Sequence, residues 1–170
     1  MTLTHLDRGS GLLQDWSANS SGKSKVIMVL MRVAQEAHRR GGLLGKVVVG
    51  VYKVLTTWIL GVEIPPETQI GAGCKLLHPV AIVINGEARI GSGVTIRNSV
   101  TIGNVVGKDG LVSASPVIGD DVELGAGCLV LGAITVGAAA RVGAGAVVVK
   151  DVEAGATVVG NPARPIGPSR

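Results

Sequence analysis

The sequence repeats every six residues from Ile64 onward, and this period constrains the fold more than any other feature. Each unit opens on an aliphatic residue, with one two-residue shift and one interruption along the way. These residues are Ile64, Ile70, Leu76 and Ile82, then Ile84, Ile90, Ile96 and Ile102, then Ile118, Leu124, Val130, Val136, Val142 and Val148. Three six-residue units close one triangular coil, so the repeat predicts a mainly β fold, a triangular parallel β-helix.

A second compact residue stands four places after each aliphatic one, and we expect it to pack beside that residue. Glycine often follows the aliphatic residue directly, where it permits close or unusual backbone geometry at a corner. The compact residues are Thr68, Cys74, Val80, Ala88, Val94, Val100, Val122, Cys128, Ile134, Ala140, Ala146 and Val152. Composition agrees with a narrow, regular core, because the chain has no Phe, one Tyr and two Trp but 26 Gly.

The chain divides into a helical N-terminal region over residues 1–61, a β-helix domain over residues 62–166 and a tail over residues 167–170. Ser24 is a candidate cap for a helix over 25–39, which Gly41 and Gly42 would end. A second helix is expected over 43–60. We expect this helix to pack against the β-helix or its own trimer, with a membrane-surface helix and a membrane span as alternatives. Two lysines argue against the span.

Charge and cysteine content exclude several classes of function. The net charge of +4 fits a polyanionic small ligand or an anionic surface, but no dense basic stripe with aromatic platforms indicates a nucleic-acid partner. Cys74 and Cys128 form neither a disulfide framework nor a metal-binding pair, and we expect both to pack inward. The first twenty residues lack the apolar run of a secretion signal, so we expect a cytoplasmic protein, with the inner face of the membrane as an alternative.

Two breaks in the repeat are candidate functional places, since local departures from a regular pattern often mark function. One is the shift at residues 82–84, and His78 lies just before it. The other is the excursion over residues 103–117, GNVVGKDGLVSASPV, which would form a wall beside the coil. His78 is the only histidine of the repeat, and a surface or corner role is the alternative to a catalytic one.

Several segments resemble one family of enzymes. They are LLHPVAIVINGEARIGSGVTIRNSVTIGN, GKDG, IGDDVELGAGCLVLGAITVG and the closing VGAGAVVVKDVEAGATVVGNPARPI. They are similar to the hexapeptide-repeat acyltransferases, and within them to the serine O-acetyltransferase branch. LLQDWSAN and HPVAIVIN are closer still to the colanic-acid-type exopolysaccharide O-acetyltransferases. The resemblance implies left-handed coils, a homotrimer, acetyl-CoA as co-substrate and no metal.

The resemblance assigns a catalytic role to His78 as the general base that takes the proton of an acceptor hydroxyl. In serine acetyltransferases an Asp fifteen residues before the catalytic His accompanies it, and Glu63 stands at that offset here. Glu63 would orient His78. A solvated charge at the first corner is the alternative for Glu63.

The family binds CoA in the cleft between neighbouring subunits, where small residues let pantetheine approach the backbone. The matching positions for cofactor binding are Gly107, Lys108, Ala126, Gly127, Ala144 and Gly145. Lys150 and Arg164 are candidates for the CoA phosphates. The alternatives are glycines that serve only the coil geometry and a solvated Lys150.

Three departures from serine acetyltransferases concern the acceptor. Leu77 replaces the Asp before the catalytic His, and Ala114 and Ser115 replace the Arg-His pair before Pro116. The chain also stops soon after PARPIG, without the tail that docks into a partner enzyme. The missing charges would weaken binding of a zwitterion, so the sequence favours an acetyl-CoA-dependent O-acetyltransferase of polysaccharide biosynthesis, acting on a sugar hydroxyl. A serine O-acetyltransferase and a non-catalytic β-helix scaffold are the alternatives. A zinc carbonic anhydrase of this fold would need three histidine ligands, and the repeat has only His78, so the sequence argues against that class.

Overall fold

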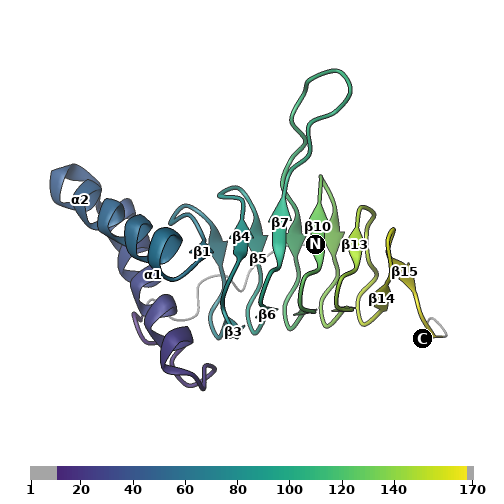
Figure 1. Cartoon of the computed structure of the whole chain (residues 1–170), viewed down its shortest axis with the longest axis horizontal. Coiled ribbons are helices and arrows are strands. Elements are labelled where there is room, and N and C mark those ends of the chain that lie inside the picture. The colour runs from purple at the N-terminus through teal and green to yellow at the C-terminus, as the bar shows by residue number, and fades with distance from the viewer. Residues whose placement is uncertain (1–10, 168–170) are drawn as a thin grey trace.

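The computed structural model describes residues 11–167. Predictions that fall on residues 1–10 and 168–170, including most of the tail, lie outside the described residues. Two helices precede a three-sided prism of short parallel strands (Figure 1). The predicted parallel β-helix is therefore confirmed.

The helical region consists of α1 (Gly22–Arg40), α2 (Gly42–Lys53) and the π-helix η1 (Val54–Ile59), which continues α2. Sheet A holds β1 (Val62–Glu63), β4 (Ile82–Ile84), β7 (Thr101–Gly103), β10 (Leu129–Leu131) and β13 (Val147–Val148). Sheet B holds β2 (Gln69–Ile70), β5 (Arg89–Ile90), β8 (Val117–Ile118) and β11 (Thr135–Val136). Sheet C holds β3 (Lys75–Leu77), β6 (Thr95–Arg97), β9 (Glu123–Leu124), β12 (Arg141–Val142), β14 (Thr157–Val159) and the antiparallel β15 (Arg164–Pro165).

The aliphatic residues of the repeat fill the prism interior, as the period predicts. All fourteen residues of that series, from Ile64 to Val148, are buried. Most of the compact residues are buried too, but Val80 is 48% exposed. The prediction for Val80 was wrong because the first coil contains two extra residues at this corner, so the count of four no longer leads to the interior. Ile134 is only partly buried.

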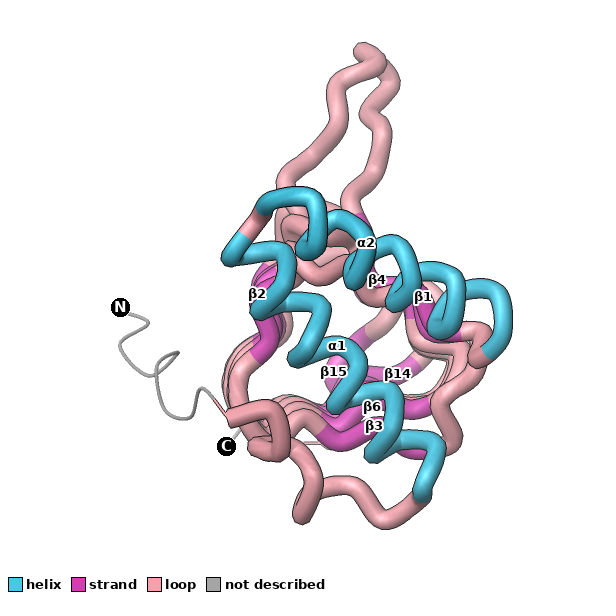
Figure 2. The backbone as a smooth tube through the Cα atoms, turned by 90° about the vertical axis from the view of Figure 1, so that its left-hand side faces the viewer, coloured by secondary structure: helices cyan, strands magenta, loops and turns pink. Residues whose placement is uncertain are grey.

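The helices α1 and α2 cross the open end of the prism, where the first coil has no preceding coil to bond (Figure 2). Asn19 bonds the free edge of the first coil at β3, accepting from Leu76 N at 2.9 Å and donating to Cys74 O at 2.8 Å. Ser24 Oγ donates to Leu76 O at 2.7 Å, and Tyr52 Oη donates to Ile64 O at 2.6 Å. The carbonyls of the first coil thus gain partners that a further strand would otherwise supply.

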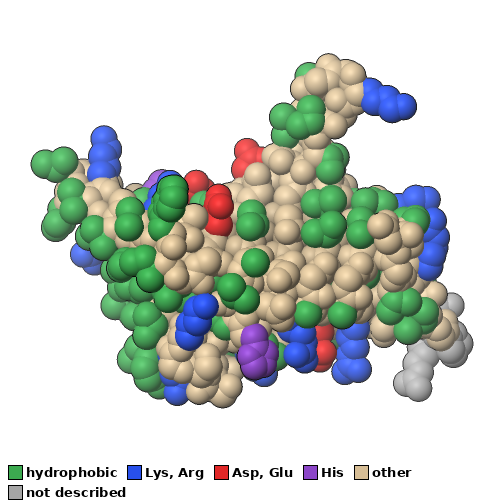
Figure 3. Space-filling view, viewed as in Figure 1, with side chains coloured by type: hydrophobic (Ala, Val, Ile, Leu, Met, Phe, Trp, Pro, Cys, Tyr) green, Lys and Arg blue, Asp and Glu red, His purple; other side chains and the backbone are tan. Residues whose placement is uncertain are grey.

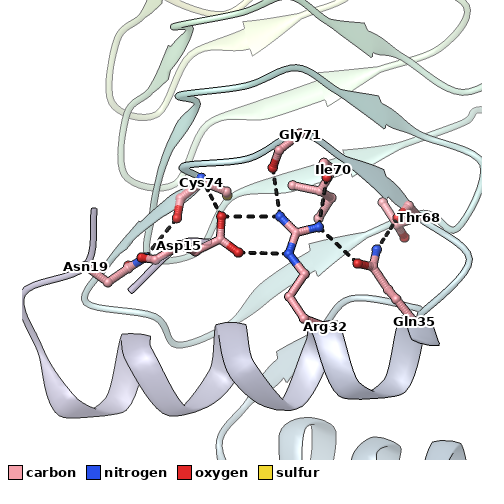
Figure 4. Close-up of polar contacts among 8 residues, drawn as sticks. All are labelled: Asp15, Asn19, Arg32, Gln35, Thr68, Ile70, Gly71 and Cys74. Carbon is pink, nitrogen blue, oxygen red and sulfur yellow. Dashed lines mark hydrogen bonds and ion pairs between the residues drawn. The ribbon is translucent and has the colours of Figure 1, made fainter. Parts of the chain in front are cut away.

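A buried ion pair organises this cap (Figure 4). Arg32 Nε lies 2.8 Å from Asp15 Oδ2, and both side chains are almost fully buried. The same guanidinium donates to Ile70 O at 2.8 Å and Gly71 O at 2.7 Å. Asp15 Oδ1 accepts from Cys74 N at 3.0 Å. Because Arg32 and Asp15 also bond the backbone at Ile70, Gly71 and Cys74, the pair fixes α1 against the first coil.

The start of α1 differs from the prediction. Ser21 is the N-cap residue, and its side chain accepts from Ser24 N at 3.0 Å. Ser24 lies inside the helix and uses its hydroxyl to bond the first coil. The predicted break at Gly41 and Gly42 is present, and both residues have positive φ.

Only one side of the second helix is covered. Gly45 packs closely against the Ala37 carbonyl of α1, and Tyr52 and Thr56 are buried toward the first coil. Leu43, Leu44, Val47, Val51, Val54, Trp58 and Ile59 are exposed, and apolar side chains gather at this end of the molecule (Figure 3). Among the described residues, Gly42–Ile59 is the one helical stretch apolar and long enough to cross a membrane by length and composition alone, with 17% of it buried. The membrane-surface alternative stays a prediction.

We expect Arg32→Met to lower the free energy of unfolding by about 3–5 kcal/mol, because it leaves Asp15 buried and unpaired. Arg39→Met is the matched control. Arg39 pairs with Glu36 on the exposed side of the same helix, so its loss should change stability by less than about 0.5 kcal/mol. Urea unfolding at matched protein concentration measures both values. Equal effects of the two substitutions would contradict the role given to the Asp15–Arg32 pair.

Candidate functional site

His78 lies in a corner that is two residues longer than the corners stacked on it. Leu76 pairs with Ile96 in sheet C and Ile84 pairs with Ile102 in sheet A. The sequence separation is therefore eight residues from Leu76 to Ile84 but six from Ile96 to Ile102. The shift in the repeat is thus an insertion at residues 78–81, and it leaves the His78 side chain exposed.

Residues with left-handed backbone recur at every corner stacked on this one, so most of them are required by the coil geometry and not by His78. Each corner between sheets C and A contains one such residue, namely Ala81, Ser99, Gly127 or Gly145, and Gly160 is a similar residue in the turn between β14 and β15. His78, with φ 54°, is the additional left-handed residue of the longer corner. Histidine tolerates this region better than most residues that have a Cβ, so the insertion is compatible with an imidazole held at the surface.

The corners between sheets C and A form one continuous edge, which we call the His78 edge. Ser99 N donates to Val80 O at 2.9 Å, Gly127 N to Asn98 O at 2.9 Å, and Gly145 N to Ala126 O at 2.9 Å. These bonds stack the corners in a column that starts at His78 and includes the predicted cofactor residues Ala126, Gly127, Ala144 and Gly145. The structure therefore brings these five predicted residues to one edge of the prism.

A shallow groove accompanies this edge on sheet C. It has a volume of about 410 Å³, and Ala126, Ala144, Arg97 and Arg141 are among the residues that line it. Arg164 lies on β15, just after the turn that ends the His78 edge, and its side chain is exposed. Small residues followed by arginines suit a ligand with an extended neutral arm and a polyanionic end.

Gly107, Lys108 and Lys150 lie elsewhere, along the corners between sheets A and B. The predicted excursion is a hairpin in which Val106 and Val112 form an antiparallel bridge, and it projects far from the prism (Figures 1 and 2). Gly107 N donates to Leu111 O at 2.8 Å near its tip, where Lys108 is exposed. We call this the hairpin edge. Within one chain, sheet A separates it from the His78 edge.

Glu63 lies on the outer face of β1 in sheet A, exposed to solvent. The corner that holds His78 abuts this strand, because Ala81 N donates to Gly61 O at 2.6 Å. Among the described residues, however, no ion pair or hydrogen bond joins Glu63 to His78. The orienting role of Glu63 therefore stays a prediction.

The residues that replace the serine-reading charges lie at both edges. Leu77 is half-buried at the end of β3, directly before His78. Ala114 is exposed at the base of the hairpin, and Ser115 Oγ donates to Asn85 Oδ1 at 3.0 Å. None of these three residues carries a charge.

Two sets of residues around the site were not predicted from the sequence. Arg97 and Arg141 face outward on sheet C beside the His78 edge, and assigning outward residues to each of the three faces would have found them. A second cavity lies between η1 and the first coil, and Trp58, Lys53 and Glu63 are among the residues that line it. It was missed because it depends on how the helical region sits on the coil, which no spacing in the repeat encodes.

Comparison with known proteins shows extensive similarity. No protein-family profile matches the chain. The chain is 39% identical over 160 residues to the acetyltransferase WcaB of Escherichia coli K12, whose name assigns it to colanic acid biosynthesis, covering 90% of this chain and 97% of that protein. It is 40% identical over 142 residues to serine acetyltransferase of Mycobacterium tuberculosis, covering 82% of this chain and 58% of that protein.

Solved structures agree with this relationship. Soybean serine acetyltransferase in complex with serine superposes with a TM-score of 0.74 at 35% identity, covering 86% of this chain and 58% of that one. Serine acetyltransferase of Neisseria gonorrhoeae gives a TM-score of 0.74 at 34% identity, covering 87% and 55%. The chain thus spans between half and two thirds of the length of these serine acetyltransferases, but almost all of the length of WcaB.

The cysteines face the prism interior, as predicted. Their accessibility decides whether a thiol could carry an acyl group during transfer. Cys74 and Cys128 are fully buried, and burial raises the pKa of each thiol to about 12, from an ordinary value of about 8.5. The protonated thiol is therefore kept in the folded chain well above pH 8.

We expect Ellman's reagent at pH 8 to leave both thiols unreacted in the folded protein and to titrate both in urea. Rapid reaction of a thiol in the folded protein would contradict this arrangement.

Proposed function

The chain belongs to the serine acetyltransferase-like family of hexapeptide-repeat acetyltransferases, and from this premise we propose that it transfers the acetyl group of acetyl-CoA to an acceptor hydroxyl on a sugar of an exopolysaccharide or its precursor. The observation that carries the proposal is the His78 edge. One uninterrupted column of corners joins the only histidine of the repeat to small residues and then to Arg164.

The His78 edge suits acetyl-CoA in both shape and charge. Ala126, Gly127, Ala144 and Gly145 leave the backbone open to a slender pantetheine arm. Arg97 and Arg141 line the adjoining groove, with Arg141 3.8 Å from Glu123, and Arg164 lies on β15 after the last turn of the edge. Their guanidinium groups would bind the phosphates. The acetyl end of the donor would then lie beside His78.

The reaction follows from a base placed at the end of this path. The imidazole of His78 takes the proton of the acceptor hydroxyl while the hydroxyl oxygen attacks the thioester carbonyl carbon. The carbon–sulfur bond then breaks, and the CoA sulfur leaves with the proton that the imidazolium returns. Glu63 would position His78 after a rotation of its exposed side chain. Direct transfer suits this chain, because both cysteines are buried in the prism and unable to carry an acyl group.

Two observations favour a sugar over serine as the acceptor. Leu77, Ala114 and Ser115 supply no charge for the amino or carboxylate group of an amino acid. Losing a charged hydrogen bond costs about 1.5–3 kcal/mol, so two such losses would weaken serine binding more than tenfold. The similarity to WcaB also spans nearly the whole of both proteins. Serine is the alternative acceptor, supported by the similarity to serine acetyltransferases.

The separation of the two edges favours a site shared between copies. His78 lies on one side of sheet A, while Gly107, Lys108 and Lys150 lie on the other. Three prisms packed side by side about a threefold axis would bring the His78 edge of one chain to the hairpin edge of its neighbour. The exposed apolar residues Val105, Val106, Leu111 and Val112 of the hairpin would then be covered. We therefore propose a homotrimer with three such sites.

The test follows CoA release from acetyl-CoA in the presence of exopolysaccharide oligosaccharides or L-serine. We expect turnover with the oligosaccharides and little with serine. His78→Asn should lower kcat about 10²–10⁴-fold. Asparagine tolerates the left-handed backbone of this corner, so the variant should keep its fold and assembly.

Efficient turnover with serine would overturn the sugar acceptor. A His78→Asn variant with an unchanged rate would overturn the base. Absence of CoA release with every acceptor would favour the scaffold alternative over an enzyme.

A further inference from the structure

A cavity of about 260 Å³ separates η1 from the first coil, and we call it the Trp58 pocket. Pockets for drug-sized ligands span roughly 300–1,000 Å³, so this one suits a single small ring. Tyr52, Lys53, Thr56, Thr57, Trp58 and Glu63 line it. Two of the three aromatic residues of the chain are therefore at one pocket, in a protein whose core uses none elsewhere.

The floor of the pocket is rigid. Tyr52 Oη donates to Ile64 O at 2.6 Å, and Thr56 Oγ1 donates to Tyr52 O at 2.9 Å. The π-helical turn is closed by Leu60 N donating to Leu55 O at 3.0 Å, and such turns are frequent at functional sites. These bonds hold the wall without using the side chains of Lys53, Trp58 or Glu63.

The polar groups at the rim are available to a ligand. Lys53 and Glu63 are exposed, and neither side chain makes an ion pair or hydrogen bond within the described residues. Trp58 is 84% exposed, although an indole of this size would normally be partly covered. An aromatic face beside one donor and one acceptor matches the two surfaces of a pyranose. The C–H groups of the pyranose would contact the negative face of the indole, and the sugar hydroxyls would bond to Lys53 and Glu63.

The Trp58 pocket and the proposed path of the acyl donor lie on opposite sides of His78. The donor path runs from His78 toward the C-terminal coils, through Ala126 and Ala144. The Trp58 pocket lies in the opposite direction, at the helical end. Glu63 connects the two places, because it lines the pocket and lies on the strand that the His78 corner abuts through the bond from Ala81 N to Gly61 O. An acceptor bound here could present a hydroxyl to His78 without crossing the donor.

We propose that the Trp58 pocket is the carbohydrate subsite of the acceptor, with a pyranose ring stacked on the Trp58 indole and its hydroxyls bonded by Lys53 and by the Glu63 carboxylate oxygen that does not face His78. This inference rests on the proposed sugar acetyltransferase function and adds the residues that read the sugar. An amino acid such as serine has no ring to stack, so the pocket would also discriminate against the alternative acceptor.

Direct binding tests the inference apart from catalysis. Saturation-transfer NMR would follow methyl glycosides of galactose, glucose and fucose, added to the His78→Asn protein so that no acetyl transfer intervenes. We expect at least one glycoside to bind, and Trp58→Ala to weaken its binding about threefold to tenfold. Trp16→Ala is the matched control, because Trp16 is also exposed, in the turn before α1, but lies outside the pocket. Lys53→Met serves as a second variant that removes a donor and keeps the apolar wall intact.

The outcomes separate this inference from the proposed function. Weaker binding by both Trp58→Ala and Lys53→Met, with Trp16→Ala unchanged, supports the subsite. Absence of binding by every glycoside, or equal affinity in the pocket variants, overturns it even if the enzyme acetylates sugars. Glycoside binding that depends on Trp58 in a protein with no transferase activity would support the subsite and overturn the proposed function.

Discussion

The backbone ladder between successive coils is the constraint on which the rest of this structure depends. Its register is 18 residues where the coil is undisturbed, as between Leu129 and Val147. The strands must keep this register to bury their aliphatic residues, so extra residues can enter only at corners. Two corners use this freedom. The first coil takes two extra residues at His78, since Val62 pairs with Ile82, and the third takes ten at the hairpin, since Thr101 pairs with Leu129. The candidate chemistry lies at both insertions.

The same ladder creates the need for the N-terminal region. A parallel coil leaves the backbone groups of its first turn unpaired, and such an edge invites other chains to pair with it. Asp15, Asn19, Arg32 and Tyr52 occupy these groups with side chains, while at the far end β15 turns back to pair with β14. Because η1 is carried by this cap, the cap also places Trp58 and Lys53 beside the first coil. A covering that the fold requires for stability thus forms one wall of the proposed acceptor site.

Much of the fold could be predicted because one short period encodes it. The buried positions of the repeat and the break at Gly41 and Gly42 follow from residue spacing alone. Val80 was misplaced because the shift was located by its aliphatic residues, and not by the corner that contains the insertion. The arginines at positions 97 and 141 could have been placed on sheet C from the same period, because every third unit of the repeat lies on that face. The Trp58 pocket could not be reached in this way, because it depends on how η1 packs against the first coil, which is not periodic in the sequence. The orientation of Glu63 toward His78 also depends on a side-chain rotation that spacing does not determine.

We propose that the His78 edge of one chain and the hairpin edge of its neighbour together form one active site. Mixed trimers test it directly. One chain carries His78→Asn, and the other carries a hairpin shortened between Val105 and Ser113, so that each homotrimer is inactive. If the site lies between chains, unfolding and refolding the two together should restore about one quarter of the wild-type sites by random assortment in a cyclic trimer. If each chain holds a complete site, every site in the mixture keeps one defect. Activity that stays at the level of the two homotrimers would then show that the site is not shared between chains.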